Sequence, residues 1–129
     1  MEAKRGSERR RSPRVPARHD LVVRPIDADG TELRAQSVNL NLGGLYCTLD
    51  HWLQPFTKIA ISLSLPISLD VDESKSVDIA VDGVVVRIEP AKREVGRTSY
   101  ECAVAFVGLD EDAELAIARY LLAELVRST

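Results

Sequence analysis

Strict alternation of apolar and polar side chains over residues 58–66 limits the fold of this chain more than any other feature of its sequence. A β-strand places successive side chains on opposite faces, whereas a helix would spread the same apolar residues around its circumference. The segment therefore predicts a strand with one face in a core and the other exposed. The apolar face would consist of Ile59, Ile61, Leu63 and Leu65, and the opposite face of Lys58, Ala60, Ser62 and Ser64.

Five other segments have strand-like apolar patterns and are separated by residues that favour turns. They are residues 21–26, 32–38, 45–49, 77–88 and 100–107. Short antiparallel strands joined by tight turns predict a mainly-β fold, a six-stranded antiparallel β-barrel. Within the fourth of these segments the apolar phase shifts around Gly83, which predicts a β-bulge or a sharp bend there. The inward residues would change from Val77, Ile79 and Val81 to Val84, Val86 and Ile88.

The C-terminal tail has a different period. Residues 110–127 repeat apolar side chains at intervals of three and four, which is typical of an amphipathic helix. Asp110 is the expected N-cap, and acidic residues follow it near the positive end of the helix dipole. The apolar stripe would pack on the barrel or against a second copy of the chain. Its expected members are Leu115, Ala118, Leu121, Leu122, Leu125 and Val126.

The N-terminal segment, residues 1–17, has few apolar side chains and contains Pro13 and Pro16. It cannot bury enough surface to offset the entropy of ordering, so we expect an arm that is flexible without a ligand. The domain organisation is therefore a basic arm at 1–17, a barrel at 18–109 and a helix at 110–127.

Charge is distributed unevenly between the arm and the body. Residues 1–18 carry a net charge of +5, whereas residues 19–129 carry −8, for a total of −3. An acidic body argues against binding along a nucleic-acid polymer or an anionic membrane. The local positive field suits a compact anionic ligand.

Composition excludes several other classes. No apolar run approaches the roughly 18 residues of a membrane helix, and no apolar segment follows the N-terminal charges, so we expect no membrane insertion and a cytoplasmic location. Cys47 and Cys102 are expected to be buried, reduced thiols, and no metal site is expected. No nucleophile–base pair or phosphate-binding Walker loop is evident, so the chain is not expected to be an enzyme.

The sequence also predicts where three aromatic residues and one arginine of the barrel lie. Trp52 and Phe56 are expected in the core or at the rim of the barrel. Tyr46 is expected to pack on the sheet, and Arg87 is expected at the surface, where it could also face a ligand.

Two groups of residues could form a ligand site. An arginine offers five donors in a planar fork that fits phosphate oxygens and the O6 and N7 edge of guanine. An asparagine can read a base edge, and glycine lets the backbone approach a ligand closely. The candidate ligand-binding residues are Arg9, Arg10, Arg11 and Arg14 on the arm, and Asn39, Asn41, Gly43 and Gly44 in the turn before residue 45.

These residues resemble the motifs of the PilZ domain, a bacterial receptor module for cyclic diguanylate (c-di-GMP). Residues 10–14 fit the Arg-x-x-x-Arg motif of its N-terminal arm. Residues 39–44 fit its (Asp/Asn)-x-Ser-x-x-Gly motif at Asn39 and Gly44, while Asn41 stands where the family has Ser. Residues 53–66, 83–87 and 100–106 and the C-terminal helix are also similar to family segments.

The resemblance implies a function and leaves an alternative open. It implies that c-di-GMP docks beside the turn, that the arm closes over it, and that ordering of the arm passes the signal to an unidentified protein effector. One or two ligand molecules and a monomer or homodimer are all compatible with it. The alternative is an adaptor that binds no nucleotide, and the replacement of Ser by Asn41 motivates it.

Overall fold

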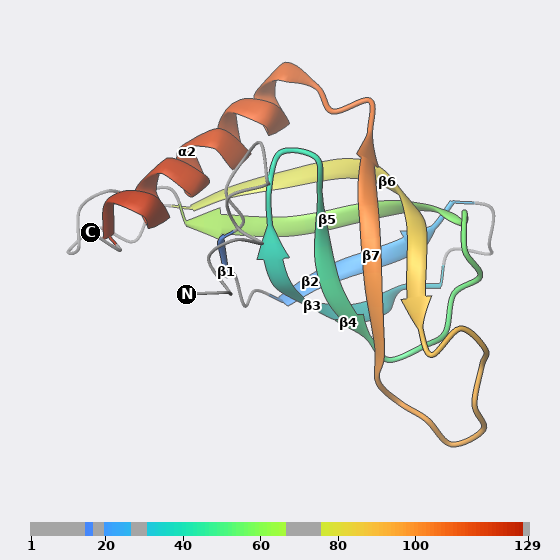
Figure 1. Ribbon diagram of the computed structural model, residues 1–129. Helices are drawn as coiled ribbons and strands as arrows, with labels where there is room; N and C mark the ends of the chain where they lie inside the picture. The colour runs from blue at the N-terminus through green and yellow to red at the C-terminus, as the bar shows by residue number, and fades with distance from the viewer. Residues whose placement is uncertain (1–14, 17–19, 27–30, 67–75, 128–129) are drawn as a thin grey trace.

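Among the residues that the structure describes, six antiparallel strands close into a barrel (Figure 1). The computed structural model describes residues 15–16, 20–26, 31–66 and 76–127. The strands follow one another around the barrel in the order β3-β2-β5-β6-β7-β4, and pairing of β3 with β4 closes it. The predicted barrel is therefore confirmed. The strands are β2 (Asp20–Pro25), β3 (Leu33–Leu40), β4 (Gly44–Leu49), β5 (Lys58–Pro66), β6 (Ser76–Glu89) and β7 (Tyr100–Val107).

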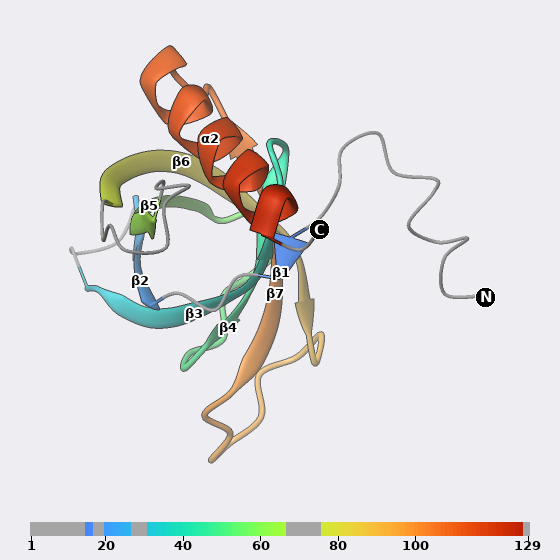
Figure 2. The ribbon, with the colours of Figure 1, turned by 90° about the vertical axis from the view of Figure 1, so that its left-hand side faces the viewer.

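A further short strand, β1 (Val15–Pro16), pairs with the end of β3 that extends beyond its pairing with β2. Val15 pairs with Leu40, and Pro16 pairs with Asn39. The sequence placed both residues in the arm and did not predict this strand. Figure 2 shows β1 beside β3 and near the C-terminal end of the helix.

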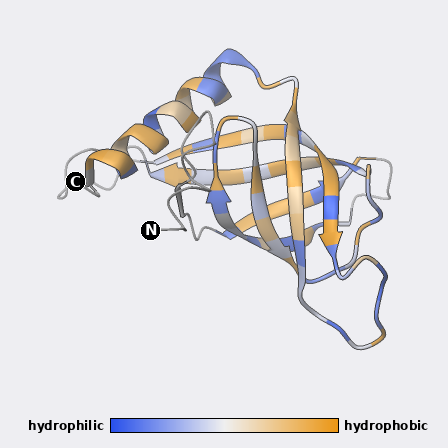
Figure 3. Ribbon diagram, in the orientation of Figure 1, coloured by the Kyte–Doolittle hydropathy of each residue, from blue (hydrophilic) through white to orange (hydrophobic). Residues whose placement is uncertain are grey.

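The core fills the barrel with the inward side chains of every barrel strand. Along β5 the burial pattern alternates as predicted, with Ile59, Ile61, Leu63 and Leu65 buried. Figure 3 shows the same alternation of hydrophobic and hydrophilic residues along the strands. Because each strand contributes one apolar face, closing the sheet removes all of these faces from water together.

Strand β6 departs from its expected geometry. Burial continues to alternate over residues 79–85, and the register with β7 shifts only between Val85 and Arg87. The bulge predicted at Gly83 is therefore wrong, and so is the inward orientation of Val86, which is exposed. Gly83 is itself an inward position of the strand, so the apolar pattern misread a buried glycine as a break.

The helix α2 spans Glu111–Arg127 and contacts β5, β6 and β1. The predicted cap is confirmed, because Asp110 Oδ1 accepts the N–H of Ala113 at 2.8 Å. The predicted buried stripe is mostly wrong: Leu121 is buried, whereas Leu115 and Leu122 are exposed. The face against the barrel combines three alanines, whose small side chains let the helix approach closely, with three larger residues. It consists of Ala113, Ala116, Ile117, Tyr120, Leu121 and Ala123.

The connection between β4 and β5 contains Trp52 and Phe56. Trp52 is partly buried against the core, as expected. Phe56 is 77% exposed, so of its two expected positions the core is wrong. Its φ of 70° lies in the left-handed region, which costs energy for a residue with a Cβ.

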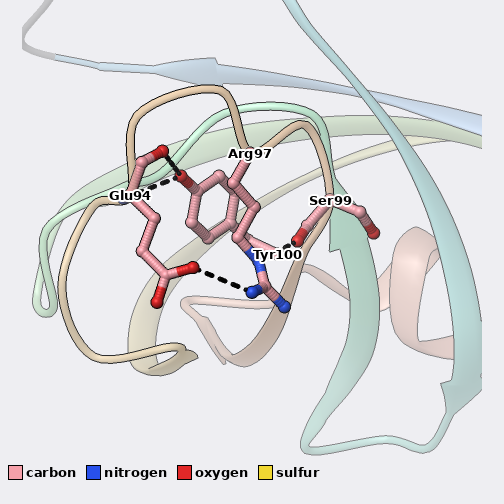
Figure 4. Close-up of polar contacts among 4 residues, drawn as sticks. All are labelled: Glu94, Arg97, Ser99 and Tyr100. Atoms are coloured by element: carbon pink, nitrogen blue, oxygen red, sulfur yellow. Dashed lines mark hydrogen bonds and ion pairs between the residues drawn. The ribbon is translucent and has the colours of Figure 1, made fainter.

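The loop between β6 and β7 is held by Tyr100, whose ring is buried (Figure 4). The Tyr100 hydroxyl donates to the carbonyl oxygen of Glu94 at 3.1 Å and accepts the N–H of Glu94 at 3.2 Å. Arg97 donates to the Glu94 carboxylate at 3.0 Å and to the Ser99 carbonyl oxygen at 2.9 Å. The buried hydroxyl is therefore satisfied, as burial of a tyrosine requires.

Candidate functional site

The turn between β3 and β4 is organised by the side chain of Asn41. Its Oδ1 accepts the N–H of Gly43 at 2.7 Å and the N–H of Gly44 at 2.9 Å. The N–H of Asn41 in turn donates to the carbonyl oxygen of Gly44 at 3.0 Å. This is an Asx turn, and a serine hydroxyl can form the corresponding ST turn. Asn41 can therefore fill the same structural role as the serine of the family motif.

Gly44 lies where no larger residue fits. A Cβ built on Gly44 would overlap the carbonyl oxygen of Val104 on the neighbouring strand β7. At Gly43 the nearest atom to such a Cβ is Asn41 Oδ1 at 3.4 Å, an ordinary contact. The two glycines thus differ: the packing of β4 on β7 requires glycine at position 44, whereas position 43 is exposed and has room for a Cβ.

Asn39 lies in strand β3, two residues before the turn. The sequence placed it within the turn, but β3 continues through Leu40, and its register with β4 shifts between Ser37 and Asn39. This shift brings Leu40 into the core, where it is buried, and leaves Asn39 partly exposed. The predicted boundary is wrong because the bulge extends pairing beyond the point where the apolar alternation breaks.

Pairing across five strands places Asn39 in one transverse row, which we call the outer row. Pro16 pairs with Asn39, Asn39 with Tyr46, Tyr46 with Ala103, and Ala103 with Arg87. From Asn39 to Arg87 the row crosses three strand spacings, about 14 Å at ~4.8 Å each. Flanking residues on these strands are buried, so the side chains from Asn39 to Arg87 lie on the outside of the barrel. These flanking residues are Leu40, Leu45, Cys47, Cys102, Val104 and Ile88.

Arg87 and Tyr46 contact one another at the far end of the row. Arg87 Nη2 donates to the Tyr46 hydroxyl at 3.2 Å, and Arg87 Cζ lies 5.9 Å from the centroid of the Tyr46 ring. Ala103, which has the smallest side chain in the row, lies on β7, between the strand of Tyr46 and the strand of Arg87. The arrangement places a guanidinium fork and an aromatic ring side by side on the outside of the barrel, a pairing of groups that suits a planar anionic ligand.

The arm enters the described structure beside this row. Val15, which follows Arg14 directly in the chain, pairs with Leu40, the residue before Asn41. Arg10 is four residues before Arg14, a span of at most about 13 Å in extended chain. Arg9, Arg10, Arg11 and Arg14 themselves lie outside the described residues. The described chain therefore begins next to the turn, as closure of an arm over a ligand there requires.

The sequence analysis predicted no contact between Tyr46 and a ligand. It placed Arg87 at the surface and left open whether Arg87 faces a ligand. Their alternation with buried neighbours indicated outward side chains on 45–49 and 77–88. Their contact depends on the register shift in β6, which turns Arg87 into the row opposite Ala103. That register was not readable from the apolar pattern.

Two thiols lie on the core side of the same strands. Cys47 and Cys102 are directly opposite one another on β4 and β7, and both are buried and free, as predicted. Hydrogen bonding to Cys102, together with burial, raises the pKa of the Cys47 thiol well above its ordinary value. The Cys47 thiol is therefore inert at neutral pH, because the thiolate is the nucleophilic form.

A metal site and a membrane-spanning helix are both absent from the described ranges. No group of three or more His, Cys, Asp and Glu side chains is arranged there to hold a metal ion. The helix described at Glu111–Arg127 is too short and too polar to cross a membrane, and no other helix is described.

Solved structures similar to this chain are PilZ proteins or contain the same fold. MotI/DgrA, the inhibitor of motility from Bacillus subtilis, matches with a TM-score of 0.70 and 20% identity over 92% of this chain and 52% of that protein. This chain therefore spans about half the length of MotI/DgrA. The PilZ domain of YcgR from Escherichia coli, solved with c-di-GMP, matches with a TM-score of 0.66 and 20% identity over 93% of this chain and 94% of that domain.

A third structure, the PilZ domain of CeSA from a cellulose-synthesizing bacterium, has a TM-score of 0.56 and 16% identity, and the match covers 86% of this chain and 96% of that domain. At these identities the structural likenesses show the fold alone. No curated protein matches the chain. The model of the PilZ domain family matches residues 8–123, which is most of the sequence. With the barrel, the arm at the edge of β3 and the Asn-Gly turn in place, this chain belongs to the PilZ domain family.

Proposed function

We propose that this protein is a receptor for c-di-GMP and that the ligand binds on the outer row, between the turn and the N-terminal arm. The observation that carries the proposal is the pairing of Val15 and Pro16 with Leu40 and Asn39. It brings the end of the Arg-x-x-x-Arg motif next to the Asn-x-Asn-x-x-Gly motif, although more than 20 residues separate them in the chain.

Each group in the proposed site has a chemical role. Arg10 and Arg14 supply guanidinium forks for phosphate oxygens and for the O6 and N7 edge of guanine, with Arg9 and Arg11 assisting. Asn39 reads a base edge. Asn41 and Gly43 shape the turn, and Gly44 lets β4 pack against β7.

The proposed output is ordering of the arm and its recognition by a protein effector. Strand β1 contacts both β3 and α2, so a change in the arm has a direct mechanical connection to the helix. A surface that forms only with the ligand present is a sufficient switch, because the effector then binds one state better than the other. We place this receptor, which carries out no reaction of its own, in the bacterial cytoplasm.

The alternative function is that of an adaptor that binds no nucleotide. Its motivation is Asn41 in place of the usual Ser. The hydrogen bonds of Asn41 to Gly43 and Gly44 weaken this motivation, because the amide oxygen closes the turn as a hydroxyl would. The receptor is therefore the function that we prefer.

Titration calorimetry of the full chain with c-di-GMP tests the proposal. We expect saturable binding with a dissociation constant of micromolar or below, and a loss of at least about tenfold in affinity in Arg10→Ala and in Arg14→Ala, because each removes charge-assisted hydrogen bonds. The matched control is Arg5→Ala, which removes the same charge from the same arm outside the motif and should bind like wild type. Absence of heat with the wild-type chain at tens of micromolar would refute the receptor function and leave the adaptor.

A further inference from the structure

The helix α2 carries an exposed apolar stripe on the face turned away from the barrel. Leu115, Leu122 and Val126 are 54%, 57% and 52% exposed, and Leu125 is 40% exposed. The opposite face of the helix, which includes Ile117 and other buried residues, is already packed on the barrel. Figure 3 shows that hydrophobic residues are concentrated toward the C-terminal end of the helix. Gathered apolar side chains of this kind mark an association surface.

The spacing of the stripe identifies the kind of surface that would cover it. Leu115, Leu122 and Leu125 of the stripe, together with the half-buried Ala118, follow one another at intervals of three, four and three residues. This is the a and d pattern of a two-stranded coiled coil, in which the side chains of one helix fit between those of an equivalent helix. The stripe therefore fits a second helix with the same spacing better than it fits an irregular surface.

The charges beside the stripe indicate which helix this is and how it runs. Glu114 and Arg119 are both exposed and occupy the g and e positions on its two sides. In a parallel pair, a g residue faces the e residue five positions later in the other helix. Glu114 of one copy would then face Arg119 of the second copy, and symmetry would form this ion pair twice. In an antiparallel pair the g edge of one helix faces the g edge of the other, so Glu114 would not meet Arg119, which lies at an e position.

We propose that two copies of this chain associate by parallel pairing of α2 through Leu115, Ala118, Leu122 and Leu125. The two barrels lie on opposite sides of the helix pair, because each barrel is packed on the face of α2 opposite the stripe. Since the pattern covers only two heptads, the dimer is weak and reversible. The proposal does not depend on nucleotide binding.

Sedimentation velocity of the full chain over a concentration series tests whether the dimer forms. The average mass should rise from 14.2 kDa toward twice that value over tens to hundreds of micromolar. Leu122→Glu should lower the association constant at least tenfold, because it places a charge in the middle of the stripe. Val95→Glu is the matched control, since Val95 is fully exposed on the loop between β6 and β7 and should leave association unchanged. A wild-type chain that remains at 14.2 kDa throughout overturns the proposal, and so does a mass that Leu122→Glu leaves unchanged.

Charge reversal and cross-linking test the parallel arrangement. Glu114→Arg and Arg119→Glu should each weaken association, and the double variant should recover it. Leu122→Cys should form a disulfide-linked dimer on air oxidation, because a parallel pair brings the two copies of residue 122 together, whereas Arg93→Cys on an exposed loop should not. Failure of the double variant to recover association overturns the proposal, as does failure of Leu122→Cys to cross-link. Circular dichroism of each variant verifies the fold.

Discussion

Asn41 Oδ1 lies 2.9 Å from the N–H of Gly44 and 2.7 Å from the N–H of Gly43, so one amide oxygen satisfies two backbone donors of the turn beside the outer row. The geometry explains how an asparagine can replace the serine of the family motif. It also distinguishes two roles of the turn. One is to maintain its own conformation, and the other is to present Asn39 and the glycine backbone to a ligand.

Substitutions of Asn41 should distinguish these two roles, because stability and ligand affinity can be measured separately. Asn41→Ser should change the free energy of unfolding by less than about 1 kcal/mol, because a hydroxyl can accept the same donors. Asn41→Ala should lower it by about 1–3 kcal/mol, because two donors lose their acceptor. Urea unfolding measures both, and c-di-GMP calorimetry should give affinities for Asn41→Ser within a few fold of wild type. A large gain of affinity in Asn41→Ser would instead support the adaptor.

Gly44→Ala should destabilise the barrel, whereas Gly43→Ala should not. The new methyl group at Gly44 overlaps the carbonyl oxygen of Val104, which belongs to backbone that cannot move without breaking the pairing of β4 with β7. We expect the free energy of unfolding of Gly44→Ala to fall by about 1–3 kcal/mol, the usual cost of overpacking. Equal thermal midpoints for the two variants would contradict this account of the turn.

Arg87→Ala should weaken c-di-GMP binding about tenfold if the outer row is the ligand surface, since a charge-assisted hydrogen bond contributes about 1.5–3 kcal/mol. Tyr46→Phe keeps the ring and removes the hydroxyl that Arg87 contacts, so it should have a smaller effect than Tyr46→Ala. Arg34→Ala is the matched control, because Arg34 is exposed on the same barrel but pairs with Val22, outside the row. Calorimetry in which Arg87→Ala and Arg34→Ala behave alike would remove Arg87 from the site.

Phe56→Gly should stabilise the protein despite the loss of an aromatic ring. Phe56 has a φ of 70° and is 77% exposed, so it carries backbone strain and contributes little burial. Glycine removes a left-handed penalty of roughly 1–2 kcal/mol and adds back roughly 0.5–1 kcal/mol of unfolded-state entropy. We expect a net gain of up to about 1 kcal/mol in urea unfolding. Phe56→Ala, which keeps the Cβ, should show no gain, and a gain of the same size in both variants would point away from backbone strain.

Stability should fall as the pH rises above the ordinary thiol range. In the folded state the hydrogen bond between the two thiols raises the pKa of Cys47, which burial raises further, and lowers the pKa of Cys102. Above about pH 8.5 the unfolded chain therefore loses both thiol protons, whereas the folded chain keeps the proton on Cys47. The folded state then binds more protons than the unfolded state, and the free energy of unfolding decreases by up to about 1.4 kcal/mol per pH unit. Denaturation between pH 7 and 10 should show this slope, and Cys47→Ala should flatten it. An unchanged slope in that variant would assign the pH dependence to other groups.

Much of the fold follows from short-range patterns. Alternation alone predicted β5 and β7 with the bounds that the structure has, and Asp110 was correctly predicted as the cap of α2. These features depend on the backbone geometry of a few consecutive residues, which the sequence determines directly. The residues of the Asn-Gly turn were also recognisable, because their chemistry is local.

Other features were decided only by closure of the barrel. The sequence by itself predicted an amphipathic helix with one apolar stripe, but contact with β5 and β6 decided that the face carrying Ala113, Ala116 and Ala123 is the buried one. Likewise the pairing of Val15 with Leu40 and the contact of Arg87 with Tyr46 join residues that lie far apart in the chain. Such contacts depend on strand register and on the bulges in β3 and β6. Register and bulges are determined by the pairing of all the strands in one closed sheet, which no short segment of the sequence determines alone.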